Sequence, residues 1–190
     1  MCSNKLAVVL LLLAISGCGS WTDDLAPSGK DKRPADELTS ASTSTTETIG
    51  SAVGQKAPDF TLSDSLGNSV TLSTIAPSAG GVVLYFTMWC PTCDTHMSYI
   101  RDYVMPSYPK VVFYAVDYVS GSVADARSAE VSNGYVGSGF TVLADTAQTV
   151  LTAYDGTMGT TVVIDKNGIV KMNEDLKNGT TLQTVLGKLP

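Results

Sequence analysis

Two nearly continuous apolar runs constrain most strongly what this chain can fold into. Residues 81–86 read GVVLYF and residues 110–118 read KVVFYAVDY. A strand with one solvated face alternates apolar and polar residues, so these runs predict central strands that are buried on both faces. A helix is predicted between them, over residues 91–105. Strands that alternate with helices in this way favour an α/β domain.

The flanking sequence extends this domain in both directions. Short strands are predicted over 59–62 and 70–72, as an N-terminal hairpin extension. Asn167 and Gly168 predict a tight hairpin late in the chain, because both residues tolerate a positive φ. A tight hairpin joins antiparallel strands, so the fold class is α/β with a mixed central sheet flanked by helices. The other predicted elements are helices over 123–133, 147–154 and 180–189 and strands over 141–143, 160–165 and 169–172.

The first 17 residues are typical of an export signal. Lys5 precedes an apolar run over 6–15, which is shorter than the roughly 20 residues that span a bilayer as a helix. The run ends in ISGC, which resembles the lipobox of bacterial lipoproteins, so we expect a signal peptide over 1–17 and lipidation at Cys18. An ordinary secretory signal and a retained N-terminal membrane anchor are the alternatives.

A compositional shift follows Cys18. Eight of the ten residues from Thr39 to Thr48 are Ser or Thr, and few apolar groups are available to offset the entropy of ordering. We expect a flexible tether over 18–51 and a folded domain over 52–190; the alternative is an extension that folds back. The protein is then exported and anchored to the membrane on its periplasmic side through Cys18. In Gram-negative lipoproteins, an Asp directly after the lipidated Cys favours retention in the inner membrane. This chain has Gly19 at that position, which favours the outer membrane.

The charge balance argues against nucleic acid as a partner. The chain has 12 basic and 18 acidic side chains and a formal net charge of −6. Phosphate binding requires a basic face, and the sequence has no long Lys/Arg run. A monomer is expected.

The motif with the clearest chemistry is WCPTC over residues 89–93, between the first central strand and the following helix. Pro91 suits the first helical position, where no N–H is needed. Cys90 then lies at the helix N-terminus, whose free N–H groups and dipole stabilise a thiolate. Cys93 is aligned with Met97 and the rest of the apolar stripe, and we expect it to be buried. We therefore expect Cys90 to attack a substrate disulfide and Cys93 to resolve the mixed disulfide.

Other uses of the two cysteines remain open at this point. A structural disulfide across so small a loop would constrain the unfolded chain little. A zinc site lacks ligands, because His96 is the only histidine and no further free Cys remains. A copper(I) site could use Cys90, Cys93 and His96 with Met88 and Met97. For single residues, we expect Met97 in the core, Trp89 at the rim beside Cys90, and His96 and Asp117 in solvent.

Three stretches carry a family resemblance, at residues 54–62 (GQKAPDFTL), 82–93 (VVLYFTMWCPTC) and 160–168 (TTVVIDKNG). They resemble the AhpC/TSA–TlpA/ResA redoxin branch of the thioredoxin-like superfamily. The resemblance implies a thioredoxin-like fold and a membrane-tethered thiol–disulfide oxidoreductase. It also implies protein disulfides or dithiols as substrates, reduction as the direction, and no metal or organic cofactor.

The chain also departs from the pattern of this family. Met158 and Gly159 occupy the place of its cis-proline, so we expect a trans bond there. These two residues, together with Trp89, Pro91 and Thr92, are the expected substrate-binding or site-shaping residues. Leu84 stands where thioredoxins bury an acid, so no general base is assigned.

Two related families supply alternative functions. The chain resembles peroxiredoxin-like thiol peroxidases at Thr87, three residues before Cys90. It lacks the proline and the arginine of that family, because Val83 and Gly159 stand at those positions. The copper-binding Sco family has a similar fold, but it uses a longer cysteine spacing and a distant histidine.

Overall fold

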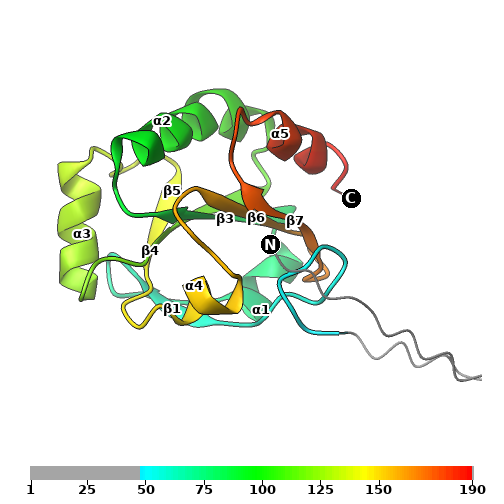
Figure 1. Cartoon of the computed structure of the whole chain (residues 1–190), viewed down its shortest axis with the longest axis horizontal. Coiled ribbons are helices and arrows are strands. Elements are labelled where there is room, and N and C mark those ends of the chain that lie inside the picture. The colour runs from blue at the N-terminus through cyan, green and yellow to red at the C-terminus, as the bar shows by residue number, and fades with distance from the viewer. Residues whose placement is uncertain (1–47, 190) are drawn as a thin grey trace, which may run out of the picture. The chain divides into compact units, whose positions relative to one another are not determined.

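The computed structural model describes residues 48–189. Its centre is a seven-stranded sheet in the order β2-β1-β5-β4-β3-β6-β7 (Figure 1). The three central strands β3, β4 and β5 are parallel, whereas every pair outside them is antiparallel. The predicted mixed sheet and final hairpin are thus confirmed. The strands are β1 Thr61–Asp64, β2 Ser69–Thr71, β3 Gly81–Thr87, β4 Val111–Asp117, β5 Phe140–Ala144, β6 Thr160–Ile164 and β7 Val170–Asp175.

Five α-helices accompany these strands in the described residues: α1 Leu72–Ile75, α2 Pro91–Tyr99, α3 Val123–Ser132, α4 Thr149–Ala153 and α5 Thr180–Leu186. Figure 1 shows α2 and α5 over one face of the sheet and α1 and α4 over the other. Every residue of β3 is buried, as its apolar sequence predicts. Alternate β3 side chains point into different layers: Val83 and Tyr85 pack with α2 and α5, whereas Leu84 and Phe86 pack with α1 and α4.

The helix after β3 is less regular than predicted. α2 ends at Tyr99, and a π-helical turn over Ile100–Val104 and a 3-10 turn over Met105–Ser107 follow it. Pro106 has no N–H for the next helical hydrogen bond, which explains why the helix does not continue. α1 and the 3-10 turn over Ala76–Ser78 were not predicted, because their pattern is too short to distinguish from a loop.

The start of the described region lies against the sheet. Residues 48–51, inside the range expected to be tether, already bond to the domain: the Lys56 N–H donates to the Thr48 carbonyl at 3.0 Å and Asn173 Nδ2 to the Ser51 carbonyl at 3.1 Å. The expected signal peptide, Cys18 and most of the expected tether lie outside the described residues. Among the helices of residues 48–189, none is both long and apolar enough to cross a membrane.

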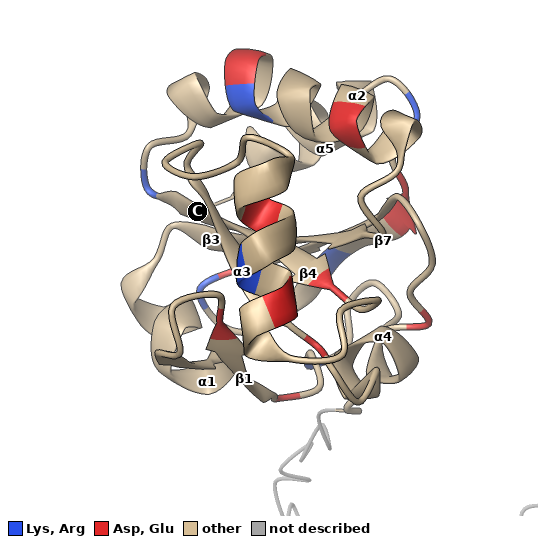
Figure 2. Ribbon diagram, turned by 90° about the vertical axis from the view of Figure 1, so that its left-hand side faces the viewer, with Lys and Arg blue, Asp and Glu red and all other residues tan. Residues whose placement is uncertain are grey.

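Charged residues of both signs are interspersed on the surface of α3, which faces the viewer in Figure 2. Arg127 Nη1 lies 2.7 Å from Glu130 Oε2 on this helix. Glu130 is buried and also accepts a hydrogen bond from Ser65 Oγ, at 2.5 Å. The group therefore ties α3 to the turn after β1.

Candidate functional site

The candidate site lies where β3 ends and α2 begins. Cys90 has extended backbone angles and is the N-cap of α2, and Pro91 is the first helical residue, as predicted. The Cys93 N–H donates to Cys90 Sγ at 3.1 Å, and the Asp94 N–H donates to the Cys90 carbonyl at 2.9 Å. The sulfur of Cys90 therefore accepts one of the N–H groups that every helix start leaves without a backbone partner.

The two thiols differ in exposure. Cys93 is completely buried in the layer between the sheet and α2, whereas Cys90 is half-buried and packs at the edge of that layer. Both are free thiols in this structure. Met97 is also completely buried, so the predictions of burial for Cys93 and Met97 are confirmed. A substrate that approaches from solvent reaches Cys90 first.

The pKa values of the two thiols depend on each other. Burial raises the pKa of Cys90, and its hydrogen bond with the Cys93 side chain raises it further. Burial also acts to raise the pKa of Cys93, but hydrogen bonds from the Cys90 side chain and from the Met88 backbone outweigh it and lower that pKa. The prediction of a lowered pKa at Cys90 is wrong: in the structure the pKa is raised at Cys90 and lowered at Cys93. One thiolate is stabilised within the pair and a second ionisation is opposed.

Trp89 has an unusual backbone conformation for a large side chain, with a φ of 59°. Its N–H donates to Thr87 Oγ1 at 3.0 Å, and its indole Nε1 donates to Asp117 Oδ2 at 2.8 Å. Its ring packs against Tyr135, with 6.0 Å between the ring centroids. Trp89 is half-buried beside Cys90, which agrees with the expected position at the rim.

Asp117 is the anchor for this tryptophan. The prediction that it is solvated is wrong, because Asp117 at the end of β4 is completely buried. Its carboxylate also accepts hydrogen bonds from the N–H groups of Val119 and Ser120, at 3.1 and 3.0 Å, and from Ser120 Oγ at 2.6 Å. These donors offset the cost of burying a charge. Its position could have signalled this role, because the carboxyl ends of parallel strands meet at one edge of a sheet.

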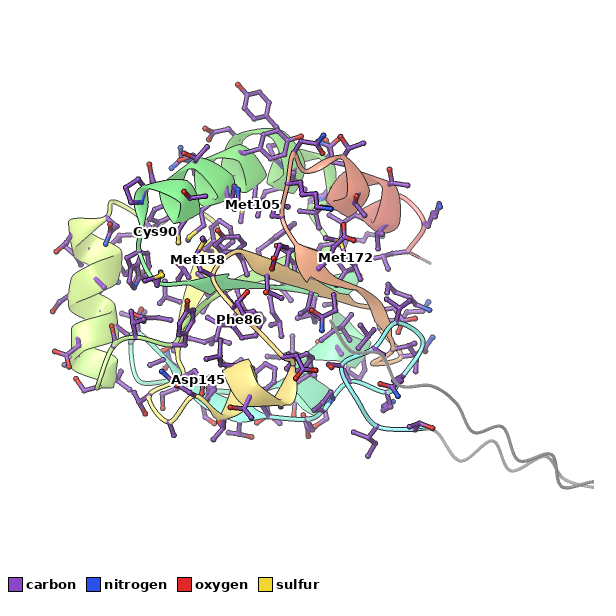
Figure 3. All side chains as sticks on the ribbon, in the orientation of Figure 1. Phe86, Cys90, Met105, Asp145, Met158 and Met172 are labelled. Carbon is purple, nitrogen blue, oxygen red and sulfur yellow. The ribbon has the colours of Figure 1, made fainter. Side chains whose placement is uncertain are left out.

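Met158 and Gly159 lie against the end of β3. The Gly159 N–H donates to the Phe86 carbonyl at 3.0 Å, which places this loop beside the β3–α2 turn. The described residues contain no cis peptide bond, so the predicted trans bond before Gly159 is confirmed. Met158 is partly exposed, and Figure 3 shows it at the same end of the sheet as Cys90. Pro91 and Thr92, the other expected site-shaping residues, are exposed.

His96 is held by a contact that the sequence did not predict. The expectation of a solvated histidine is wrong, because His96 is half-buried and its Nδ1 lies 3.0 Å from the hydroxyl of Tyr85. The rings of these residues meet edge to face, with centroids 6.0 Å apart. A Cβ atom at Gly159 would stand 3.6 Å from His96 Nδ1, so the loop packs directly over this pair. The sequence offers only a weak signal for it, one turn of helix beyond the motif.

The described residues hold no group of three or more His, Cys, Asp or Glu side chains placed to bind a metal ion. The Thr87 side chain, which raised the peroxidase alternative, is completely buried, and its Oγ1 accepts the Trp89 N–H. The geometry of the site thus comprises two neighbouring thiols, an anchored tryptophan and a tyrosine–histidine pair.

Comparison with known proteins agrees with this geometry. The model of the AhpC/TSA family matches residues 53–173. Over 128 residues the chain is 34% identical to "Thiol-disulfide oxidoreductase ResA" of Geobacillus kaustophilus; the match covers 66% of this chain and 71% of that protein. A second such protein, from Geobacillus thermodenitrificans, matches to the same extent.

Solved structures show the same fold. The thioredoxin domain of a thiol-disulfide oxidoreductase from Bacteroides vulgatus matches with a TM-score of 0.58 and 20% identity, over 73% of this chain and 99% of that one. The peroxidoxin BcpB of Mycobacterium tuberculosis matches with a TM-score of 0.57 and 22% identity, over 72% and 95%. Because both neighbours share the fold, the fold alone does not separate disulfide exchange from peroxide reduction. Its family match, its relatives and its fold together show that the chain belongs to the AhpC/TSA family, as a thioredoxin-like thiol–disulfide oxidoreductase.

Proposed function

We propose that Cys90 and Cys93 are the redox pair of this thiol–disulfide oxidoreductase and that protein disulfides are its substrates. The observation that carries the proposal is the N-cap geometry: a reachable sulfur accepts the N–H of a second cysteine whose own sulfur is buried directly behind it. A thiolate is the attacking form in disulfide exchange, and this arrangement stabilises one thiolate within the pair.

The reaction then has two steps. The Cys90 thiolate attacks one sulfur of the substrate disulfide, so that a mixed disulfide forms and the other substrate sulfur leaves as a thiolate. Cys93 loses its proton and attacks Cys90 Sγ, which forms the Cys90–Cys93 disulfide and expels the second substrate sulfur. The substrate gains two electrons and two protons, and the pair of cysteines loses them. Trp89 and the Met158–Gly159 loop border the face from which the substrate approaches.

Reduction of insulin disulfides in the presence of an external thiol tests this mechanism. In a Cys2→Ser, Cys18→Ser background, which leaves only the two cysteines of the motif, activity should equal that of the full-length chain. Adding Cys90→Ser should reduce activity to the uncatalysed rate. Adding Cys93→Ser should instead accumulate a mixed disulfide that is visible by mass spectrometry. Full activity in either variant contradicts the proposal.

We further propose that the protein is exported and tethered to a membrane by lipid on Cys18, with reduction as its physiological direction. The lipobox-like ISGC sequence at 15–18 supports the anchor, and the name of the curated relatives supports thiol–disulfide chemistry. Export of the full chain in a Gram-negative host should place it in the membrane fraction, and Cys18→Ala should release it. Recovery of both forms in the same fraction contradicts the lipid anchor.

A further inference from the structure

We propose that Tyr135 is a positioning residue for the exchange reaction, because it holds both residues that flank the two cysteines. It acts through Trp89, directly before Cys90, and through Asp94, directly after Cys93. These contacts keep the two sulfurs in the geometry that resolution of the mixed disulfide needs. The inference rests on the proposed redox role of Cys90 and Cys93.

The side chain of Tyr135 reaches both flanks of the motif. Its hydroxyl donates to Asp94 Oδ1 at 2.7 Å and lies 3.2 Å from the Asp94 carbonyl oxygen. Its ring packs against the indole of Trp89, with 6.0 Å between the ring centroids and 51° between the ring planes. One side chain thus contacts the residue before the first cysteine and the residue after the second.

Tyr135 is itself bound to the scaffold, although it lies in the loop between α3 and β5. Its N–H donates to the Glu130 carbonyl of α3 at 3.0 Å, and its own carbonyl accepts the Ser138 N–H at 3.1 Å. The side chain is only 1% exposed, and its ring meets that of Phe140 in β5 at a steep angle, with centroids 6.2 Å apart. The tyrosine therefore links the redox motif to the core of the domain.

The Tyr135 hydroxyl keeps its proton at neutral pH. Burial is the main cause that raises the pKa of Tyr135 to about 12; the hydrogen bond with Asp94 adds to this rise, and the one with Ser98 opposes it. The proton thus remains available to the Asp94 carboxylate, and a hydrogen bond to a charged acceptor is stronger than one between neutral groups. The Arg101 guanidinium lies over the tyrosine ring, 5.9 Å from its centre.

The two flanks matter because resolution of the mixed disulfide is intramolecular. Cys93 attacks Cys90 Sγ within one turn of helix, and the rate of such a step depends on the distance and direction between the two sulfurs. The Asp94 N–H donates to the Cys90 carbonyl at 2.9 Å, so a contact that holds Asp94 also holds the first turn of α2. Trp89 has a φ of 59°, a conformation that persists only where its surroundings hold it. The first attack, on a substrate that arrives from solvent, depends less on this geometry.

Stopped-flow reaction with an equimolar amount of an aromatic disulfide, dithiobis-nitrobenzoate, tests the proposal. The parent protein is the full-length chain in the Cys2→Ser, Cys18→Ser background. The first coloured thionitrobenzoate is released when Cys90 attacks, and the second when Cys93 resolves. The rate of the first phase rises with concentration and that of the second does not, so the two steps are measured separately.

Tyr135→Leu removes both contacts and should slow the second phase by about tenfold or more, with a far smaller effect on the first phase. Tyr135→Phe keeps the ring and loses only the hydroxyl, so it should restore most of the rate and remain about threefold slower than the parent. In a Trp21→Phe background, the fluorescence of Trp89 should change in Tyr135→Leu and stay nearly the same in Tyr135→Phe.

Tyr154→Phe is the matched control. Tyr154 is also buried and its hydroxyl also donates at 2.7 Å, to the Pro58 carbonyl, but it lies in the layer with α1 and α4. Its loss should change neither phase. Asp94→Ala completes a double-mutant cycle: in that background Tyr135→Phe should slow the second phase little further, because the acceptor carboxylate is already absent.

The outcomes separate this inference from the proposed function. A parent protein without a fast second phase overturns the redox role of the pair, and the positioning role with it. A normal parent with an unchanged second phase in Tyr135→Leu, or with both phases slowed equally, overturns the positioning role alone. If Tyr135→Leu does not fold, the cycle decides: a Tyr135→Phe effect that is absent, or equally large with and without Asp94, rejects the positioning role.

Discussion

Two turns at opposite ends of the sheet each combine a residue of positive φ with a buried aspartate, but the two turns differ in where that support comes from. In the turn after β3, Trp89 has a φ of 59° and is supported by the buried Asp117 of β4. In the β6–β7 turn, Gly168 has a φ of 77° and is supported by the buried Asp165, which immediately follows β6. The register of β6 on β3 places these turns at opposite ends of their strands.

The difference lies in where the support comes from. Asp165 accepts hydrogen bonds from the N–H groups of Asn167 and Ile169, both within four residues, and glycine takes the positive φ without strain. The turn after β3 gives the positive φ to a tryptophan, and the partner of its indole lies 28 residues away in the sequence. Such a conformation costs about 1–3 kcal/mol and persists only where the surrounding structure holds it. The β6–β7 turn is thus stabilised by its own neighbouring residues. The turn after β3, which carries the thiols, is stabilised by a residue that is distant in the sequence.

The comparison predicts its largest effect at Asp117. Asp117→Ala should lower insulin reduction by about tenfold to a hundredfold, because Trp89 loses its anchor and the thiols lose their fixed geometry. The matched variant Asp165→Ala should retain its turnover per folded molecule. In a Trp21→Phe background, the fluorescence of Trp89 should change in the first variant and not in the second. Equal turnover in Asp117→Ala and Asp165→Ala would contradict the claim that only the turn after β3 supports activity.

The next effect concerns stability at the opposite end. Asp165→Ala should lower the free energy of unfolding by about 1–3 kcal/mol, since the N–H groups of Asn167 and Ile169 lose their acceptor and Lys171, at 3.0 Å, loses its ion pair. Urea titration measures this loss.

The pH dependence of that loss has a defined sign. Burial acts to raise the pKa of Asp165, but the N–H groups of Ile169 and Asn167 and the Lys171 ammonium outweigh it, so the pKa falls below its ordinary 3.8. A group whose folded pKa is lowered contributes stability above its unfolded pKa and loses it as pH falls through the folded pKa. The difference in the free energy of unfolding between wild type and Asp165→Ala should therefore decrease only below about pH 4. A gap that is constant down to acid unfolding argues against this origin.

The smallest effect is expected at Gly168. Gly168→Ala should cost about 1–2 kcal/mol, because an L-residue is strained at this φ and its Cβ would meet Lys56 Cε at 3.1 Å. Gly121→Ala is the control: its φ is not positive, and its Cβ would meet only Asp125 Oδ2, at 3.8 Å. Thermal unfolding should show a clear loss in the first variant and almost none in the second. A loss of the same size in both would mean that the backbone strain at Gly168 is not the cause.

The same comparison explains what the sequence could and could not predict. The hairpin at Gly168, the buried strand β3 and the helix start at Pro91 all follow from neighbouring residues, and all were predicted. The αL conformation of Trp89 and the burial of Asp117 depend on the packing of β4 beside β3, which no local pattern contains. The meeting of Tyr85 with His96 depends on how α2 crosses the sheet. Local chemistry located the thiols, whereas the groups that support them required the tertiary structure.

The most direct test of the account is the rate at which each thiol of the folded, reduced protein reacts with iodoacetamide at neutral pH, resolved by peptide mass spectrometry. Cys90 should be labelled at least about tenfold faster than Cys93, because Cys90 is half-buried at the edge of its layer whereas Cys93 is completely buried. Slow and equal labelling of both residues, at the rate of the unfolded peptide, would contradict the account.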